Sequence, residues 1–464
     1  MGDELTIGAL TNTGAEGCYF DEMRIYNRVL KDDEIAKLSE RVEALVPKLI
    51  SASGGHHDAG DYNPRSHIDV AQVLMDAYEI APKKFYDGQL NIPEKDNGIP
   101  DILDEALWAL KLWIGLQDED GGVYNGTESD GDPNFFQTVE LDPKGDFAFA
   151  KDCRGSLQFA GAMAQASRLL ERIGKAEVAA DYLKRARRAY DWGVSHKPQT
   201  NDAKTFGFYY TAPLAYAAAQ LFHTTGEDAY HQAFFDNTPW KKNPKAKMIP
   251  NDNSYDLTLA AYAYATIPIP KADPTVHSDV VRSICEEADM YVKASTQAPY
   301  KFVRHPYAPI NWGTGAYEHF LPVVWHAWAF TDNNLKVKAY RDAMIKTADN
   351  TLGCNPLNIS WIVGIGSNSI HAPLHNSRFN PTGFSVSGMQ AQGPDNKGKE
   401  YSYTDTLFPN RDKTPPLYCF IDSIFAIGMD EGTVIHQAET MAAFGLLLPD
   451  AKKPAESEKK NNGK

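Results

Sequence analysis

Several features that mark common classes of protein are scarce or absent in this sequence. Its 464 residues include only five cysteines, which are widely scattered and form no CxxC pair, so neither a zinc ribbon nor a dense disulfide framework is supported. No apolar run approaches the ~20 residues of a membrane-spanning helix, and the run at 321–330 is interrupted by His326. The chain also lacks a GxGxxG or Walker phosphate-binding loop. What remains is a globular protein without a nucleotide-binding, zinc-ribbon or membrane signature.

Positive charge is in deficit as well. The chain has 46 lysines and arginines against 61 aspartates and glutamates, which gives a net charge of −15. Such a protein would repel a phosphate backbone, so we expect no nucleic-acid partner. The lack of a long apolar run predicts no membrane partner either. Aromatic residues, in contrast, make up 11% of the chain. That content suits stacking against sugar rings, although core packing accounts for most aromatic residues in most proteins.

The two ends of the chain differ from its body. Residues 18–26 alternate in polarity as a strand would, and an amphipathic helix is predicted to follow over about 33–49. This stretch resembles the last strand and tail of a laminin-G-like, concanavalin-type sandwich. We therefore predict that residues 1–37 are a remnant of such a domain or a linker, the alternative being a short N-terminal strand with no domain of its own. Residues 451–464 are predicted to be a polar tail.

The body, residues 38–450, reads as a succession of helices. Apolar residues recur at helical spacing over 102–117, and glycine or proline bounds several similar runs. No βαβ pattern interrupts them, so the sequence predicts an all-α domain of helical hairpins. Periodicity alone does not distinguish a closed ring of hairpins from a helical solenoid. Further helices are predicted at about 155–172, 176–195, 211–225, 255–266, 276–296, 316–331, 334–352 and 433–447.

The sharpest local feature is a glycine-bounded turn that carries two carboxylates. Residues 54–62 read Gly-Gly-His-His-Asp-Ala-Gly-Asp-Tyr, so Asp58 and Asp61 are three apart where small residues let backbone and solvent come close. Taken alone, such a segment is usually an ordinary loop. Nearby histidines could bind a metal, but adjacent histidines on a turn usually point in opposite directions, so we predict no metal site.

Further motifs follow this turn in a fixed order. Residues 99–108 read Ile-Pro-Asp-Ile-Leu-Asp-Glu-Ala-Leu-Trp, 120–124 read Asp-Gly-Gly-Val-Tyr, and 352–356 read Leu-Gly-Cys-Asn-Pro. With these motifs, the chain over about residues 40–448 resembles glycoside hydrolase family 9, the inverting cellulases and their relatives. The family's C-terminal signature is matched in spacing, with Ile427 in place of an aromatic residue and Gln437 in place of Asn, by Phe420, Asp422, Ile427, Glu431, Thr433, Gln437 and Ala438.

The resemblance implies an (α/α)6 barrel with an open cleft and an endoglucanase-like activity on β-1,4-linked glucans, with no organic cofactor. Inversion needs one carboxylic acid to protonate the departing oxygen and one carboxylate to activate water on the opposite face. By position in the motifs, Glu431 is the acid, Asp61 the base and Asp58 a residue that helps to hold the water. A neighbouring charge on Asp430 and partial burial are both expected to keep Glu431 protonated.

Aromatic and basic residues in the loops are candidates for contact with the sugar. After a motif that residues 360–368 match here, the family continues to Pro-His-x-Arg. In this chain Pro373 is followed by Leu374, and His375 and Arg378 are displaced by one and two places. This departure bears on the preference for plain cellulose more than on hydrolysis. Trp361 and Tyr317 could also be sugar platforms, with core packing at least as plausible for each. The predicted substrate-binding residues are His57, Tyr62, Trp312, His375, Arg378 and Tyr403.

Some alternatives stay open from sequence alone. The enzyme could be an exo-acting β-glucosidase or glucosaminidase of the same family, if loops close one end of the cleft. It could also be a non-catalytic glycan-binding protein, although the presence of all three carboxylates argues against this. Structural calcium occurs in some relatives and is possible here. Only about residues 35–50 are available to replace the family's first barrel helix, and otherwise the ring is incomplete. We expect the protein to be secreted, with the native signal and upstream domain absent from this chain.

Overall fold

A computed structural model describes most of the chain beyond residue 47. The described residues are 31, 48–51, 53–58, 66–129, 146–248, 255–306, 320–375, 386–396 and 405–451. The chain divides into two units, residues 1–47 and 48–464. The predicted laminin-G-like remnant and the polar tail therefore lie outside the described residues, apart from Lys31 and Ala451.

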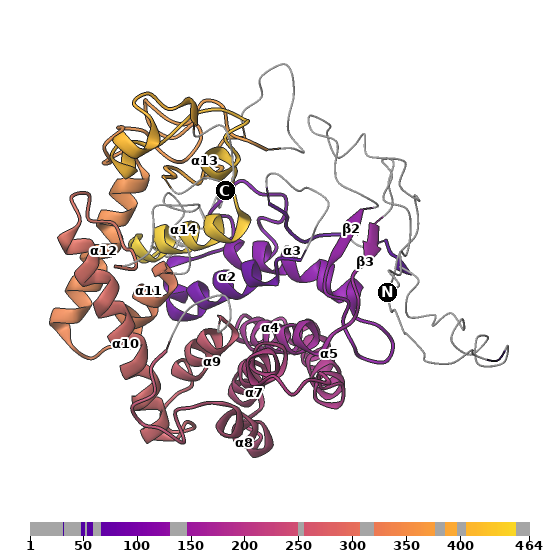
Figure 1. Cartoon of the computed structure of the whole chain (residues 1–464). Coiled ribbons are helices and arrows are strands. Elements are labelled where there is room, and N and C mark those ends of the chain that lie inside the picture. The colour runs from indigo at the N-terminus through magenta and orange to yellow at the C-terminus, as the bar shows by residue number, and fades with distance from the viewer. Residues whose placement is uncertain are drawn as a thin grey trace, which may run out of the picture. The chain divides into compact units, whose positions relative to one another are not determined.

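The second unit consists mainly of helices (Figure 1). None of the helices in its described part combines the length and apolar character that crossing a bilayer requires. Short helices are α6 (Ala203–Phe206) and α13 (Ile427–Asp430). The longer helices are α2 (Ile68–Ile80), α3 (Asp101–Leu116), α4 (Cys153–Arg172), α5 (Ala176–Ser195), α7 (Ala212–Thr225), α8 (Asp228–Asn237), α9 (Tyr255–Ala265), α10 (Pro274–Gln297), α11 (Phe320–Phe330), α12 (Asn334–Thr351) and α14 (Val434–Leu447).

These helices form an inner and an outer ring. Along the inner ring α2 contacts α4, α4 contacts α7 and α7 contacts α9, while α14 contacts both α11 and α2. Outer helices pack against this ring as α3 on α2, α5 on α4, α8 on α7, α10 on α9 and α11, and α12 on α11. The inner helix α4 is buried on nearly all sides, whereas α5 buries a narrow stripe of small residues. The predicted all-α, (α/α)6 barrel is confirmed.

The connectivity of the helical hairpins brings the segments before α2 and α14 to the same end of the barrel. Because each outer helix returns the chain across the ring, the inner helices run in the same direction. The segments that precede α2 and α14 therefore meet at one end of the barrel. In the described part of the chain α14 has no outer helix of its own. Whether residues before Lys48 supply one, as the sequence left open, lies outside the described residues.

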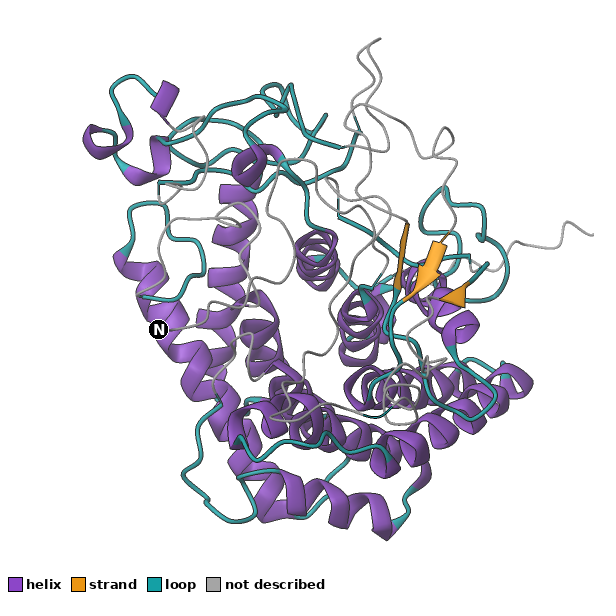
Figure 2. Cartoon of the chain, turned by 45° about the vertical axis from the view of Figure 1, so that its right-hand side comes forward, coloured by secondary structure: helices purple, strands orange, loops and turns teal. Residues whose placement is uncertain are grey.

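A small antiparallel sheet lies at the edge of the helical unit (Figure 2). Its strands are β1 (Lys48–Leu49), β2 (Thr127–Ser129) and β3 (Asp146–Ala148), in the order β1-β3-β2. Lys48 pairs with Ala148 and Leu49 with Phe147. The predicted helix was therefore wrong in extending to Leu49, because these two residues find a strand partner that a local pattern does not reveal.

Helix ends and close contacts fix the ring. Asp152 caps α4 by accepting a hydrogen bond from the Gly155 backbone N–H at 2.6 Å, and α7 ends at Gly226 with a positive φ of 74°. At the α4–α7 contact, a Cβ on Gly161 would lie 2.3 Å from the Tyr216 ring. Glycine at this position thus lets the Tyr216 ring rest on the α4 backbone.

A buried ion pair joins α2 to α4. The Glu79 carboxylate accepts hydrogen bonds from Arg168 at 2.9 and 2.7 Å and lies 3.0 Å from Arg172. Burial opposes ionisation of Glu79, but the two guanidinium groups outweigh it and lower the pKa of Glu79 to about 2. The stabilisation from this pair is therefore present above the unfolded-state pKa and is lost as the pH falls toward 2.

Replacing Arg168 by leucine is expected to lower the free energy of unfolding by about 3–5 kcal/mol, because it leaves the buried Glu79 carboxylate short of its main partner. Chemical denaturation at neutral pH measures the change. Arg185→Leu is the control, since it removes an i,i+4 pair with the exposed Asp181 and is expected to cost less than about 1 kcal/mol. Equal losses in the two variants would contradict the role given to the buried pair.

Candidate active site

The glycine-bounded turn is fitted against helix α3. Gly54 and Gly55 have φ of +88° and +80°, a region that favours glycine. A Cβ on Gly54 would lie 2.6 Å from the Trp108 carbonyl oxygen, and one on Gly55 would lie 2.5 Å from Leu112. The Gly55 N–H donates to the Trp108 carbonyl at 3.0 Å. Both glycines are thus required for the backbone to approach α3, which aims the residues that follow.

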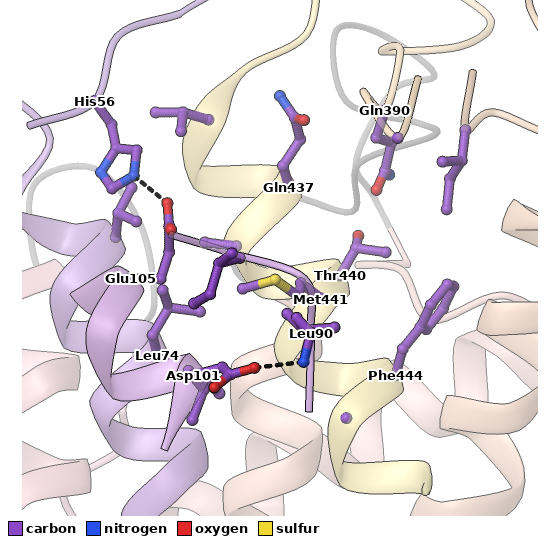
Figure 3. Close-up of a pocket in the computed structure, with 18 of the residues that line it drawn as sticks. His56, Leu74, Leu90, Asp101, Glu105, Gln390, Gln437, Thr440, Met441 and Phe444 are labelled. Atoms are coloured by element: carbon purple, nitrogen blue, oxygen red, sulfur yellow. Dashed lines mark hydrogen bonds and ion pairs between the residues drawn. The ribbon is translucent and has the colours of Figure 1, made fainter. Parts of the chain in front are cut away.

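The two histidines of the turn have different partners. His56 Nε2 is 2.7 Å from Glu105 Oε1 on α3, a contact drawn in Figure 3. His57 Nδ1 is 2.8 Å from the Asp58 carbonyl oxygen, and its ring meets that of His375 edge-on with centroids 6.0 Å apart. The structure thus brings together His57 and His375, both predicted to bind substrate, and Glu105 is a residue of this site that sequence reasoning missed. Its place within the 99–108 motif was the available signal.

Asp58 connects the start of the domain to its end. Its Oδ1 accepts a hydrogen bond from the Val434 backbone N–H, the first residue of α14, at 2.7 Å across 376 positions of sequence. Its Oδ2 lies 3.7 Å from His67 Nε2. A carboxylate at this position satisfies an unpaired N–H of the helix and is favoured by the helix dipole. The carboxylate turn therefore lies directly beside the segment that carries Glu431.

Glu431 lies in a turn between α13 and α14 and is 6% exposed. Its N–H donates to the Ile427 carbonyl at 3.1 Å, and its carbonyl accepts from the Gln392 N–H at 3.1 Å. Leu374 pairs with it in a parallel bridge, one residue before His375. The expected partial burial of Glu431 is thus present, and the backbone around it is held from two sides.

Asp422, a residue of the C-terminal signature, ties the same framework together. Its carboxylate accepts hydrogen bonds from the backbone N–H groups of His371 and Ala372 at 2.9 and 2.8 Å. It also lies 2.9 Å from His371 Nδ1. Asp422 therefore fixes the segment that leads to Leu374 and His375, and His371 is engaged by this carboxylate.

Asp430 does not contribute the charge that the sequence suggested. It is fully buried, and burial together with the like charge of Asp422 raises the pKa of Asp430 to about 9. The side chain is therefore neutral at neutral pH. The expectation that an ionised Asp430 keeps Glu431 protonated is wrong, because the site excludes the water that would stabilise that charge.

The structure describes only some of the residues that were predicted to contact the sugar. Trp361 is 2% exposed and packs edge-on against Phe420 with ring centroids 5.1 Å apart, so it belongs to the core and is no sugar platform. In the described ranges no group of three or more His, Cys, Asp or Glu side chains could hold a metal ion. The predicted base and the other predicted contacts lie outside the described residues, namely Asp61, Tyr62, Trp312, Tyr317, Arg378 and Tyr403.

A cavity of about 720 Å³ opens next to this framework. Figure 3 shows polar side chains, among them His56, Gln437 and Gln390, at one end of it. Apolar side chains of α14 and of the loop before α3, among them Phe444 and Leu90, line the other end. His57 and His375 also line it, so the cavity reaches the histidine pair beside Asp58.

The family follows from a match that covers most of the chain. Residues 24–443 match the family described as "Glycosyl hydrolase family 9". The chain belongs to glycosyl hydrolase family 9. The match begins inside the segment predicted to be a laminin-G-like remnant, and the comparisons give that remnant no support.

Relatives of this family 9 chain are known among characterised proteins. The xyloglucan-specific endo-beta-1,4-glucanase BoGH9A of Bacteroides ovatus is 25% identical over 393 residues, which cover 78% of this chain and 64% of that protein. Endoglucanase C of Cellulomonas fimi is 28% identical over 417 residues, covering 83% and 36%. A cellulose 1,4-beta-cellobiosidase of Acetivibrio thermocellus is 26% identical over 438 residues, covering 82% and 47%. The match thus spans from about a third to two thirds of the length of these relatives.

Solved structures of family 9 proteins share the fold. The family 9 endoglucanase J30 superposes with a TM-score of 0.73 at 24% identity, covering 87% of this chain and 75% of that one. A Bacteroides ovatus family 9 protein superposes with a TM-score of 0.70 at 20% identity, covering 86% and 73%. At these identities the likeness establishes the barrel architecture.

Proposed function

We propose that this family 9 protein hydrolyses β-1,4-glucosidic bonds in cellulose or related β-glucans by single displacement with inversion. Glu431 protonates the departing oxygen, Asp61 activates the water, and Asp58 helps to hold that water. The observation that carries the proposal is the hydrogen bond from the Val434 N–H to Asp58 Oδ1 at 2.7 Å. It supports a cleft in which a carboxylate turn from one end of the domain lies beside the acid-bearing turn from the other.

The chemistry of the turn fits this division of labour. Inversion requires the two carboxyl groups to lie roughly 6.5–9.5 Å apart, so that a water fits between the base and the sugar. Asp61 follows Asp58 by three residues in the same glycine-bounded sequence motif. Glu431 is buried in the turn just before α14, the helix whose first N–H is bound by Asp58. His57, His375, Tyr62, Trp312, Arg378 and Tyr403 are proposed to contact the sugar.

The relatives' names define the substrates to compare. BoGH9A is named as xyloglucan-specific, and two other relatives as a cellobiosidase and a cellodextrinase. We therefore propose an endo-acting enzyme on a β-1,4-glucan, with an exo-acting enzyme as the second candidate. We further propose that the protein is secreted, because a polymeric substrate of this kind lies outside the cell.

Reducing-sugar release from carboxymethyl-cellulose, mixed-linkage β-glucan and xyloglucan, alongside chromogenic glucosides, tests the proposal. An endo-acting enzyme is expected to lower the viscosity of the polymers early and to release the α-anomer first, seen by NMR. Release of a single small product without loss of viscosity would identify exo action. Net retention of configuration, or no hydrolysis of any of these substrates, would overturn the proposal.

A further inference from the structure

Asp430 is a buried carboxyl group that the proposed chemistry leaves unused. It is 0% exposed, although it directly precedes the proposed acid Glu431. Its Oδ2 accepts a hydrogen bond from the Ser423 backbone N–H at 2.8 Å. Its Oδ1 is also buried and has no hydrogen-bond partner among the residues that the structure describes. The Asp430 side chain therefore lies between the turn that carries Glu431 and the loop that carries Asp422.

The backbone of Asp430 belongs to the same junction. Its N–H donates to the Ala426 carbonyl at 2.9 Å, and its carbonyl accepts from the Leu374 N–H at 3.0 Å. Leu374 immediately precedes His375, so Asp430 touches the supports of both Glu431 and the histidine pair. The fixed geometry of Glu431 thus depends on three segments, namely 371–374, 421–426 and 427–431, that meet at this one residue.

The surroundings of Asp430 suit a neutral group. It forms no ion pair within the described ranges, and the charged group that acts on it there is the Asp422 carboxylate, which is itself bound by His371 and Ala372. The Glu431 side chain follows it in sequence and brings no compensating positive charge. An ionised carboxylate here would be buried beside another carboxylate with a single N–H donor, an arrangement that costs free energy.

We propose that Asp430 is a positioning residue for Glu431, and that its neutral, hydrogen-bonded side chain holds the turn that carries Glu431 in place. This inference deepens the proposed hydrolysis and rests on it for the catalytic readout. For this role the side chain at position 430 has to fill its site, accept the hydrogen bond from the Ser423 N–H and carry no charge. An asparagine meets these requirements at every pH, whereas a leucine fills the space but cannot accept the hydrogen bond.

The ratio of kcat/KM for Asp430→Asn to that of the wild type tests the proposal through its pH dependence. The two proteins differ only at this side chain, so a ratio that changes with pH reports the ionisation of Asp430. Burial, together with the nearby Asp422 carboxylate, raises the pKa of Asp430 to about 9. In the wild type the Asp430 side chain is therefore expected to change from neutral to ionised between pH 8 and 10. The ratio should be near one at pH 6 and should rise about tenfold from pH 8 to 10.

Two further variants sharpen the test. Asp430→Leu is expected to lower kcat about 10- to 100-fold at all pH values with little change in KM, because it orphans the Ser423 N–H. Asp104→Asn is the matched control: Asp104 is also buried with a raised pKa but lies on α3, so its ratio should stay flat with pH. A flat ratio for Asp430→Asn, or a wild-type kcat in Asp430→Leu, would overturn the proposal.

Thermal unfolding separates this inference from the proposed function. Between the unfolded-state value of about 4 and the folded-state pKa of about 9, the wild type must release a proton on unfolding, so Asp430 makes the fold less stable as the pH rises. Asp430→Asn lacks this effect. Its Tm advantage over the wild type should therefore grow from pH 5 to 9, even if the protein hydrolyses no glucan. A pH-independent difference in Tm would refute the neutral carboxyl.

Discussion

Replacing Glu431 by glutamine is expected to lower kcat on β-glucans by about 10²–10⁴-fold while leaving KM nearly unchanged. The amide keeps the size of the side chain in its buried turn, where the backbone bonds to Ile427 and Gln392 persist. It has, however, no proton to give to the departing oxygen. Steady-state kinetics on mixed-linkage β-glucan measure the loss.

The size of this loss should depend on the leaving group. The dinitrophenolate group of a dinitrophenyl glycoside leaves without being protonated. Glu431→Gln is therefore expected to hydrolyse such a glycoside almost as fast as the wild type does. Glu227→Gln is the control, because Glu227 is an exposed partner of Arg187 directly before α8 and should behave as wild type on both substrates. An equal loss on the polymer and the activated glycoside would contradict the acid role of Glu431.

The sequence closely predicted helices of both rings. The prediction over 176–195 coincides with α5, because α5 alternates between a narrow apolar face and a solvated one. Helices α2 and α8 were not predicted, although one belongs to the inner ring and the other to the outer ring. The inner helix α4 was predicted over 155–172 and is observed over Cys153–Arg172, even though it is buried on nearly all sides. Burial on all sides is a property of the ring, and a local window of sequence does not contain it.

The candidate site shows the same division between local and non-local information. The two glycines and the order of the motifs could be recognised in the sequence, since each motif is a local pattern. The hydrogen bond between Val434 and Asp58 joins residues 376 positions apart, so only the family signature could place them together. Protonation of Asp430 was predicted wrongly because adjacency in sequence says nothing of burial. The roles of Trp361 and Glu105 likewise depended on what packs against them.

Asp61→Asn is expected to reduce kcat on β-glucans by about 10²–10⁴-fold, because it removes the carboxylate that takes the proton from the attacking water. Sodium azide tests the role directly. Azide is a nucleophile that needs no base, so it should restore cleavage of an activated β-glucoside by Asp61→Asn and yield the α-glycosyl azide. A variant that azide leaves inactive would contradict the base role of Asp61.

Asp58→Asn provides the comparison that separates the base from its neighbour. An amide oxygen at position 58 can still accept the Val434 N–H, so Asp58→Asn should keep the cap of α14, whereas Asp58→Ala should lose about 1 kcal/mol of stability with it. Azide should rescue neither, because both variants retain Asp61. If azide instead restored Asp58→Asn and failed with Asp61→Asn, the two roles would be exchanged. The carboxylate that caps α14 would then itself be the base, which would require the helix N-terminus and the attacking water to share one carboxyl group.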